Sequence, residues 1–174
     1  KGRIVIPANK KRRMKNPCGI GKGLKTKINA NIGTSQDYPS LKAELKKLKV
    51  CVESKADTVM DLSTGGDLPK IRKAIIENSP FPVGTVPVYE AAKRSVDKKA
   101  DFSKVSVDEI FDTVERQAED GVDFFTIHAG VTYDLIRSAQ LKKRLTGIVS
   151  RGGALMARWI YKNKRENPFY EYFD

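Results

Sequence analysis

Apolar residues along the chain form short runs of strand length. Most of these runs are followed by a segment whose apolar residues have helical spacing. Residues 123–127 form one such run, whose aromatic and β-branched side chains predict a strand covered on both faces. Four other runs repeat the plan, at residues 26–33, 57–66, 82–89 and 146–153. The runs start roughly 25 to 40 residues apart, which is the spacing of successive βα units joined by right-handed crossovers. The pattern therefore predicts an α/β protein.

Three of the predicted helices have recognisable first residues. Ser40 precedes an apolar stripe at helical spacing, and Asp67 is placed to cap the next helix. Ser106 and Glu109 form a capping box, and Gly121 marks the end of the helix that this box begins.

Pro87 interrupts the strand that begins at Val83. Because proline cannot donate to a sheet ladder, we expect the chain to leave the sheet at Val86 and to present Tyr89 from a loop. Residues 93–104 carry many charges and predict a connection. Further on, the pattern predicts a short helix over 134–141, a fifth strand over 147–149 and a helix that contains Ala154 to Ile160.

The length and composition favour a soluble domain with a real core. The chain has 174 residues, 40% of them hydrophobic, and no apolar run approaches the length that spans a membrane. We therefore expect a cytoplasmic protein. Residues 1–24 lack helical spacing and predict an irregular basic arm, followed by one catalytic domain over 25–174. Cys18 and Cys51 lie far apart in sequence and predict free thiols.

The net charge of +12 is concentrated at the two ends of the chain. Residues 1–27 hold ten Lys or Arg and no acid, and residues 142–165 hold eight and no acid. Charge alone leaves three interpretations open: a solvated basic surface without a partner, a nucleic-acid interface, or an enzyme that attracts a phosphorylated substrate.

The βα pattern favours a (βα)8 TIM-barrel type of fold, in which the active site lies at the C-terminal ends of the strands. Such a barrel needs about 250 residues, and this chain supplies about the first five βα units. The sequence leaves three possibilities: a fragment of a barrel, a barrel shared by two chains, or an open sheet. The first is favoured.

Polar, aromatic or sulfur-containing side chains follow each predicted strand. His128, the one histidine of the chain, stands at the end of the 123–127 run, where an imidazole can exchange a proton or hydrogen bond to a ligand. The equivalent positions on the other strands hold Asn31, Met60, Tyr89 and Ser150. If the barrel prediction holds, these five side chains meet at one rim.

The sequence SRGG at 150–153 precedes a predicted helix. It has two interpretations: an anion site made by backbone N–H groups and Arg151, or an ordinary helix cap by Ser150. The chain contains no HExxH, GxSxG or Walker motif and no cysteine set for an iron–sulfur cluster. It therefore has residues that could hold a phosphate ester but no evident reactive centre.

Several long segments resemble the phosphomethylpyrimidine synthase family, radical S-adenosylmethionine enzymes of thiamine biosynthesis. They are IVIPAN, GIGKGL, NANIGTS, ADTVMDLSTGG, NSPFPVGTVPVY, QAEDGVDFFTIHAG and KRLTGIVSRGG. The resemblance implies a carbon–carbon lyase that converts 5-aminoimidazole ribotide into 4-amino-5-hydroxymethyl-2-methylpyrimidine phosphate. It implies that this small-molecule substrate is bound by Asn31, Met60, Tyr89, His128, Ser150, Arg151 and Gly152.

The same resemblance implies cofactors for which this chain has no ligands. The family uses a [4Fe-4S] cluster, S-adenosylmethionine and a divalent metal, zinc, and its CxxCxxxxC motif and metal-binding histidines follow the matched region. Neither occurs here, so we expect the N-terminal part of the catalytic domain of a longer, homodimeric enzyme, with no metal ligand of its own.

Two rival functions remain. The paralogous 5-hydroxybenzimidazole synthase starts from the same ribotide and would share the contacts named above. The second rival is a binding module without catalysis, for ribotide or for nucleic acid, although we do not expect nucleic acid or a membrane to be the partner.

Overall fold

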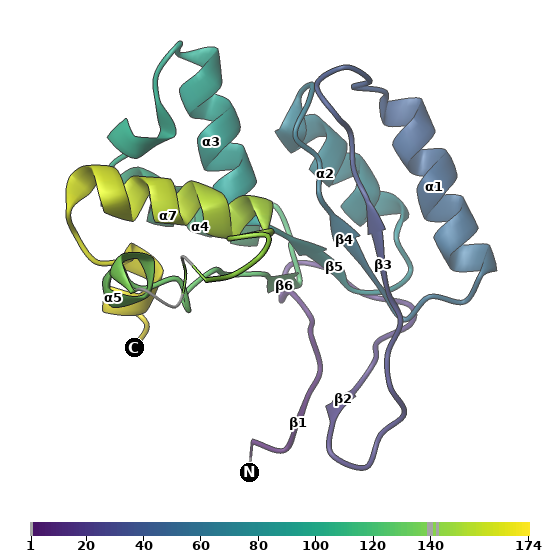
Figure 1. Ribbon diagram of the computed structural model, residues 1–174. Coiled ribbons are helices and arrows are strands. Elements are labelled where there is room, and N and C mark those ends of the chain that lie inside the picture. Colours follow the sequence, from purple (N-terminus) through teal and green to yellow (C-terminus); the bar gives the residue numbers. More distant parts are fainter. Residues whose placement is uncertain (1, 139–140, 142) are drawn as a thin grey trace. The chain divides into compact units, whose positions relative to one another are not determined.

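The computed structural model describes residues 2–138, 141 and 143–174, which form two compact units. The sheet unit contains the chain up to Val86 together with Val114–Thr126. The helical unit contains Pro87–Thr113 and Ile127–Asp174. Figure 1 shows the elements of both units, and each unit is described separately below.

The sheet unit is built on a four-stranded parallel sheet (Figure 1). Its strands follow one another in sequence order: β3 (Asn29–Ile32), β4 (Thr58–Asp61), β5 (Val83–Thr85) and β6 (Phe124–Phe125). Strands therefore form in four of the five predicted places, although each is shorter than its apolar run. Residues 123–127 were predicted to be covered on both faces, and Phe124 and Phe125 are partly buried there.

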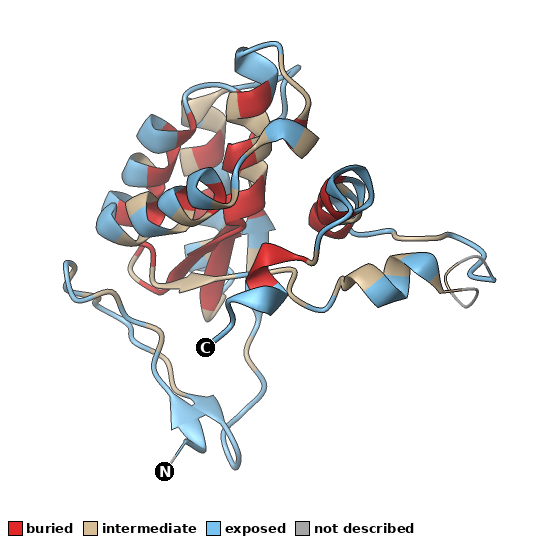
Figure 2. Cartoon of the chain, turned by 90° about the vertical axis from the view of Figure 1, so that its left-hand side faces the viewer, coloured by how far each residue is buried: buried red, intermediate tan, exposed pale blue. Residues whose placement is uncertain are grey.

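Helices α1 (Leu41–Glu53) and α2 (Leu68–Asn78) complete the core of the sheet unit. Their predicted first residues are confirmed: the Ser40 hydroxyl accepts a hydrogen bond from the Ala43 N–H, and the Asp67 carboxylate accepts one from the Lys70 N–H. Apolar side chains from both helices and three of the strands share one cluster, which includes Ile32, Leu48, Val59, Ile71, Ile75 and Val83. Figure 2 shows this buried layer along the strands and the inner faces of the helices.

The N-terminal arm contains a short antiparallel ladder, β1 (Ile4–Val5) with β2 (Ile20–Gly21). Between these strands, Asn9 and Arg12 attach the arm to Asp123, at the start of β6. The Asp123 carboxylate accepts hydrogen bonds from the Asn9 N–H at 2.8 Å and from Arg12 Nη1 at 2.5 Å. The arm is thus anchored in the sheet unit, while the boundary between an arm over 1–24 and a catalytic domain over 25–174 stays a prediction.

Helix α4 (Val107–Glu119) begins with the predicted capping box. The Ser106 hydroxyl accepts a hydrogen bond from the Glu109 N–H at 3.1 Å, and the Glu109 carboxylate accepts one from the Ser106 N–H at 3.0 Å. The bond from the Ser106 N–H is the first cause that holds the pKa of Glu109 below its usual range. The N–H groups of Ser106 and Glu109 are therefore both hydrogen-bonded by side chains three residues away. This is why the sequence predicts the capping box.

The helical unit differs most from the predictions in its first part. Pro87 begins α3 (Pro87–Asp97) instead of leading into a loop, so Tyr89 lies in the first turn of a helix and residues 93–97 are helical. The reason is that a proline costs little at a helix start, where its missing N–H would have no partner in any case. A 3₁₀ turn, η1 (Phe102–Lys104), follows.

The remaining helices of this unit are α5 (Tyr133–Arg137), α7 (Arg151–Asn163) and α8 (Pro168–Glu171). Helix α5 coincides with the first part of the helix predicted over 134–141, while residues 139 and 140 of that prediction lie outside the described residues. The long helix predicted from 154 to 160 is confirmed as α7, which begins at Arg151.

The predicted fifth strand is wrong. Residues 147–149 form no strand; Val149 is 72% exposed and Gly147 has a φ of 58°. A strand needs a neighbouring ladder for its backbone groups, and an apolar run alone does not provide one. The structure thus shows an α/β fold with a four-stranded parallel sheet.

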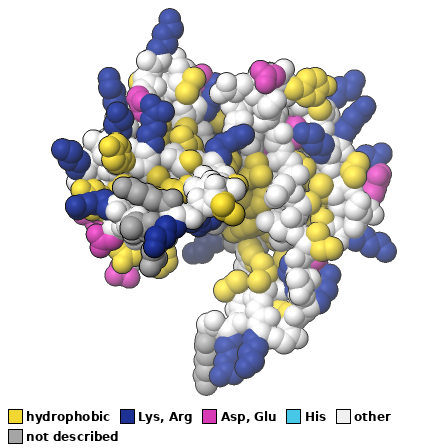
Figure 3. All heavy atoms as spheres, in the orientation of Figure 1, with side chains coloured by type: hydrophobic (Ala, Val, Ile, Leu, Met, Phe, Trp, Pro, Cys, Tyr) yellow, Lys and Arg dark blue, Asp and Glu magenta, His cyan; other side chains and the backbone are white. Residues whose placement is uncertain are grey.

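Lys and Arg side chains outnumber Asp and Glu on the face drawn in Figure 3, in keeping with the net charge. In the described part of the chain, every helix is too short or too polar to cross a membrane.

Candidate functional site

Two of the seven predicted site residues lie side by side in the sheet unit. Asn31 of β3 and Met60 of β4 are register partners in the parallel ladder, so their side chains point to the same face of the sheet. Met60 is buried, and its sulfur lies 4.0 Å from the Thr126 hydroxyl beyond the end of β6. Asn31 is exposed and available to a ligand. The sequence had given no role to Thr126.

The other five lie in the helical unit, and three of them meet at the start of α7. His128 Nε2 lies 2.9 Å from the Ser150 hydroxyl, 22 residues further along the chain. The Ser150 hydroxyl also accepts a hydrogen bond from the Gly153 N–H at 3.2 Å and so caps α7. The helix-cap interpretation of SRGG is therefore confirmed, and the anion-site interpretation stays a prediction.

Gly152 lies directly against the imidazole of His128. A β-carbon at Gly152 would stand 2.2 Å from His128 Cε1, which is far inside any real contact distance. A glycine is therefore required at 152 for the ring to stay in place. Gly153 is less constrained, since a β-carbon there would meet the Ile148 side chain at 3.1 Å.

Arg151 and Tyr89 form the second contact of the group. The Arg151 guanidinium lies 5.6 Å from the centroid of the Tyr89 ring, within the range of a cation–π interaction. The first turn of α7 thus combines an arginine, a capping hydroxyl and backbone N–H groups at the positive end of a 13-residue helix. These are the features that bind phosphate in proteins.

Burial affects the protonation of His128. Loss of solvent around the half-buried ring lowers the pKa of His128 below its usual value, so the neutral imidazole is the form present near neutral pH. Its Nδ1 atom is buried and has no hydrogen-bond partner among the described residues. This ring nitrogen lies against Gly152, and a buried ring nitrogen without a hydrogen bond is rare in native proteins.

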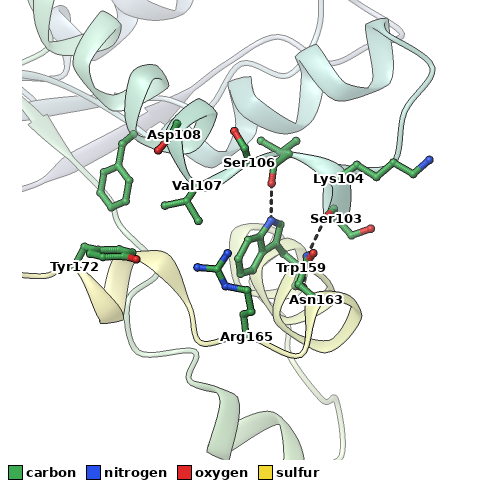
Figure 4. Close-up of a pocket in the computed structure, with 11 residues that line it drawn as sticks. Ser103, Lys104, Ser106, Val107, Asp108, Trp159, Asn163, Arg165 and Tyr172 are labelled. Carbon is green, nitrogen blue, oxygen red and sulfur yellow. Dashed lines mark hydrogen bonds between the residues drawn. The ribbon is translucent and has the colours of Figure 1, made fainter.

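One hollow of the helical unit adjoins this site, and a second hollow of the same unit does not. One, of about 530 Å³, adjoins Ser150 and is also lined by Val131, Arg144 and Ile148. The other, of about 730 Å³, lies between η1, the start of α4 and α7, where Figure 4 shows Trp159, Arg165 and Tyr172 around it. None of the seven predicted residues lines the second hollow.

The described residues do not fit an iron–sulfur cluster or a zinc ion. They contain no group of three or more His, Cys, Asp or Glu side chains placed to hold a metal. Cys18 and Cys51 are free thiols, as predicted, and burial raises the pKa of both, which disfavours the thiolate form that metals require. No chemical step is therefore assigned to a metal on this chain.

Comparison with known proteins places this geometry in context. The family model described as "Radical SAM ThiC family" matches residues 1–174. The chain belongs to the radical SAM ThiC family. Membership in this radical SAM family implies a [4Fe-4S] cluster and S-adenosylmethionine in the complete proteins.

Curated relatives carry the name phosphomethylpyrimidine synthase. The chain is 50% identical to that of Moorella thermoacetica over 173 residues and 51% identical to that of Carboxydothermus hydrogenoformans over 173 residues. The relative from Caldanaerobacter subterraneus is 51% identical over 174 residues. The alignments cover 99–100% of this chain but 40% of each relative, so the chain spans less than half the length of these ThiC family members.

The seven residues implied by the family resemblance thus fall into two groups. Asn31 and Met60 are adjacent in the sheet unit, and the other five are joined by contacts in the helical unit: Tyr89, His128, Ser150, Arg151 and Gly152. Their role in binding a ligand stays a prediction.

Proposed function

We propose that this chain supplies the ribotide-binding residues of a phosphomethylpyrimidine synthase. The complete enzyme would convert 5-aminoimidazole ribotide into 4-amino-5-hydroxymethyl-2-methylpyrimidine phosphate, as a carbon–carbon lyase of the radical SAM type. Family membership supports the enzyme class, and the curated relatives bear the name of this activity.

The contact between His128 and Ser150 carries the proposal for the substrate. It joins a neutral imidazole to the first turn of a helix whose N-terminus suits an anion. A phosphorylated imidazole sugar needs both: a cradle for its phosphate and a neutral hydrogen-bonding group for its ring or hydroxyls. Chain and ligand thereby match in charge and in hydrogen-bonding capacity.

The residues divide the work in this proposal. Ser150, Arg151 and the backbone at Gly152 hold the phosphate, and the His128 imidazole lies beside them to hydrogen bond to a polar group of the ribotide. Tyr89 holds the Arg151 guanidinium through its ring face. For Asn31 and Met60 the proposal of ribotide contacts rests on the family resemblance and on a (βα)8 barrel type of fold.

The rest of the enzyme would supply the reactive groups. In this proposal a [4Fe-4S] cluster and S-adenosylmethionine would supply the radical chemistry from ligands outside this chain, zinc would also bind outside it, and the enzyme would be a homodimer. The contribution of this chain is to bind the ribotide and to orient it.

Ribotide binding by the full-length protein tests the proposal. Isothermal titration calorimetry with 5-aminoimidazole ribotide should show that Arg151→Ala and His128→Ala each weaken binding by about tenfold or more, which corresponds to about 1.4 kcal/mol. Arg165→Ala is the matched control, because Arg165 lines the second hollow, whose lining includes none of the seven residues. Undetectable ribotide binding by the unmodified protein would refute the assignment.

The two rivals predict different results in the same preparation. A 5-hydroxybenzimidazole synthase would bind the ribotide and release a benzimidazole, which mass spectrometry of the product identifies. A nucleic-acid module would instead bind oligonucleotides with an affinity that falls steeply with salt and is lost on neutralising residues 10–13.

A further inference from the structure

We propose that Asn167 is a positioning residue for His128. This inference rests on the proposed function, since it assigns to His128 a ligand whose binding depends on the position of the ring. Asn167 lies 39 residues after His128, at the N-cap of α8. The geometry of its side-chain amide is what points to this role.

The Asn167 side chain binds the turn that follows His128 at three places. Its Nδ2 donates to the carbonyl oxygens of His128 at 2.8 Å, Ala129 at 3.3 Å and Val131 at 2.9 Å. Its Oδ1 accepts from the Phe169 N–H at 3.0 Å. The residue is 0% exposed, so water cannot substitute for these bonds.

An asparagine suits this position for a chemical reason. The side-chain amide offers two N–H donors on one side and a carbonyl acceptor on the other, which matches carbonyls in the turn and an N–H at the start of α8. Serine or aspartate could cap α8 equally well, but neither carries an NH₂ group. The turn therefore requires the donors of asparagine, whereas the helix cap does not.

Glu166 binds the other end of the same turn. Its Oε1 accepts hydrogen bonds from the Tyr133 N–H at 2.8 Å and from the Asn167 N–H at 2.7 Å. The side chains of Glu166 and Asn167 thus hydrogen bond to both N–H and C=O groups in the irregular segment 128–133. Such backbone groups would otherwise remain unpaired inside the protein.

His128 is held by residues at both ends of α7. At its start, Ser150 and Gly152 enclose the imidazole, and beyond its end Asn167 fixes the backbone of the same residue. Without the amide donors, the backbone of His128 loses its fixed position against α7. Misplacing a group of an active site by about 1 Å can cost about 100-fold in catalytic rate.

Three substitutions in the full-length protein separate positioning from capping. Asn167→Ser keeps the capping oxygen and removes the NH₂ group, and Asn167→Ala removes both. Asn163→Ser is the matched control, since the Asn163 amide donates to the carbonyls of Ser103 and Trp159 at 2.8 Å and does not touch the His128 turn.

The first readout needs no ligand. Hydrogen–deuterium exchange should become faster in the 128–133 peptide for Asn167→Ser and Asn167→Ala, and stay unchanged there for Asn163→Ser. If Asn167→Ser matches the unmodified protein while Asn167→Ala does not, the residue is only a helix cap and the inference is overturned. If neither variant folds, exchange in the unmodified protein decides: a 128–133 peptide that exchanges freely without ligand contradicts the inference.

The second readout is ribotide affinity. Asn167→Ser should weaken binding on the order of 10-fold, and combining it with His128→Ala should add little to the loss from His128→Ala alone. A residue with a purely structural role would give additive losses, which would overturn the inference. Failure of the unmodified protein to bind ribotide would refute the proposed function but leave the exchange result standing.

Discussion

The sheet unit and the helical unit place their site residues by different physical means. In the sheet unit, Asn31 and Met60 are neighbours because two parallel strands pair in one register. In the helical unit, His128 and Ser150 meet through side-chain contacts, between a turn and a helix start that no ladder connects. The first kind of placement follows from periodicity, whereas the second depends on single hydrogen bonds and on one glycine.

The largest expected effect is a loss of stability on replacing Asp123, which attaches the N-terminal arm to the sheet unit. Asp123→Ala should destabilise the protein by about 3–5 kcal/mol, because it leaves the Arg12 guanidinium and the Val83 N–H without their acceptor. The Asp123 side chain is 0% exposed, so solvent does not compensate. Urea unfolding measures the loss.

Asp97→Ala is the matched control for that change. Asp97 pairs with Lys93 on an exposed helix surface, where ion pairs contribute about 0.2–1 kcal/mol. Equal losses for the two aspartates would show that burial at Asp123 does not matter to the sheet unit.

A glycine pair tests the helical unit. Gly152→Ala should weaken ribotide binding by about tenfold or more (about 1.4 kcal/mol), because the new methyl group would overlap the His128 ring. Gly153→Ala should leave affinity within about twofold, since its β-carbon would meet Ile148 and Ser150 no closer than 3.1 Å and alanine favours the helix. A crystal structure of Gly152→Ala with His128 unmoved would contradict this explanation.

A third change tests what sequence predicts best. Ser106→Ala removes one half of the capping box of α4 and should cost about 1 kcal/mol in thermal or urea unfolding. Ribotide affinity should stay unchanged, because the Ser106 side chain bonds to Glu109 within the capping box and the seven site residues lie elsewhere in the chain. A selective loss of affinity without loss of stability would contradict this separation of fold from site.

The smallest expected effect is on how the free energy of unfolding depends on pH, and it has opposite signs in the two units. Burial lowers the pKa of His128, so the unfolded chain binds more protons than the native protein below pH about 6.5. The stability due to neutral His128 is then fully present above pH about 6.5 and is lost as pH falls through the lowered pKa. His128→Gln should remove this part of the pH dependence.

Asp61 of β4 contributes to the pH dependence of stability with the opposite sign. Burial raises its pKa, so the native protein holds the proton more tightly than the unfolded chain does. The stability it contributes is present below pH about 3.9 and is lost as pH rises through the raised pKa. Urea unfolding across pH should therefore show a falling contribution that Asp61→Asn removes, and an unchanged profile would contradict the burial of this carboxylate.

Local sequence was sufficient for features that depend on neighbours in the chain. The helix start near Ser40, the cap at Asp67 and the capping box at Ser106 were predicted correctly, because the bonds that define them lie within three residues. Prediction failed where a distant partner decides. Residues 147–149 have the composition of a strand but no ladder to join, and Pro87 is as compatible with a helix start as with a strand end.

The amino-acid sequence by itself determined the four strands of the parallel sheet, several helices with their caps, the charge distribution and the family, because periodicity, caps and long motifs are local properties. Tertiary structure alone decided that the glycine at 152 faces the imidazole and that the amide of Asn167 holds the turn after it. The physical reason is that these contacts join segments 24 and 39 residues apart, where no local propensity specifies distance or direction.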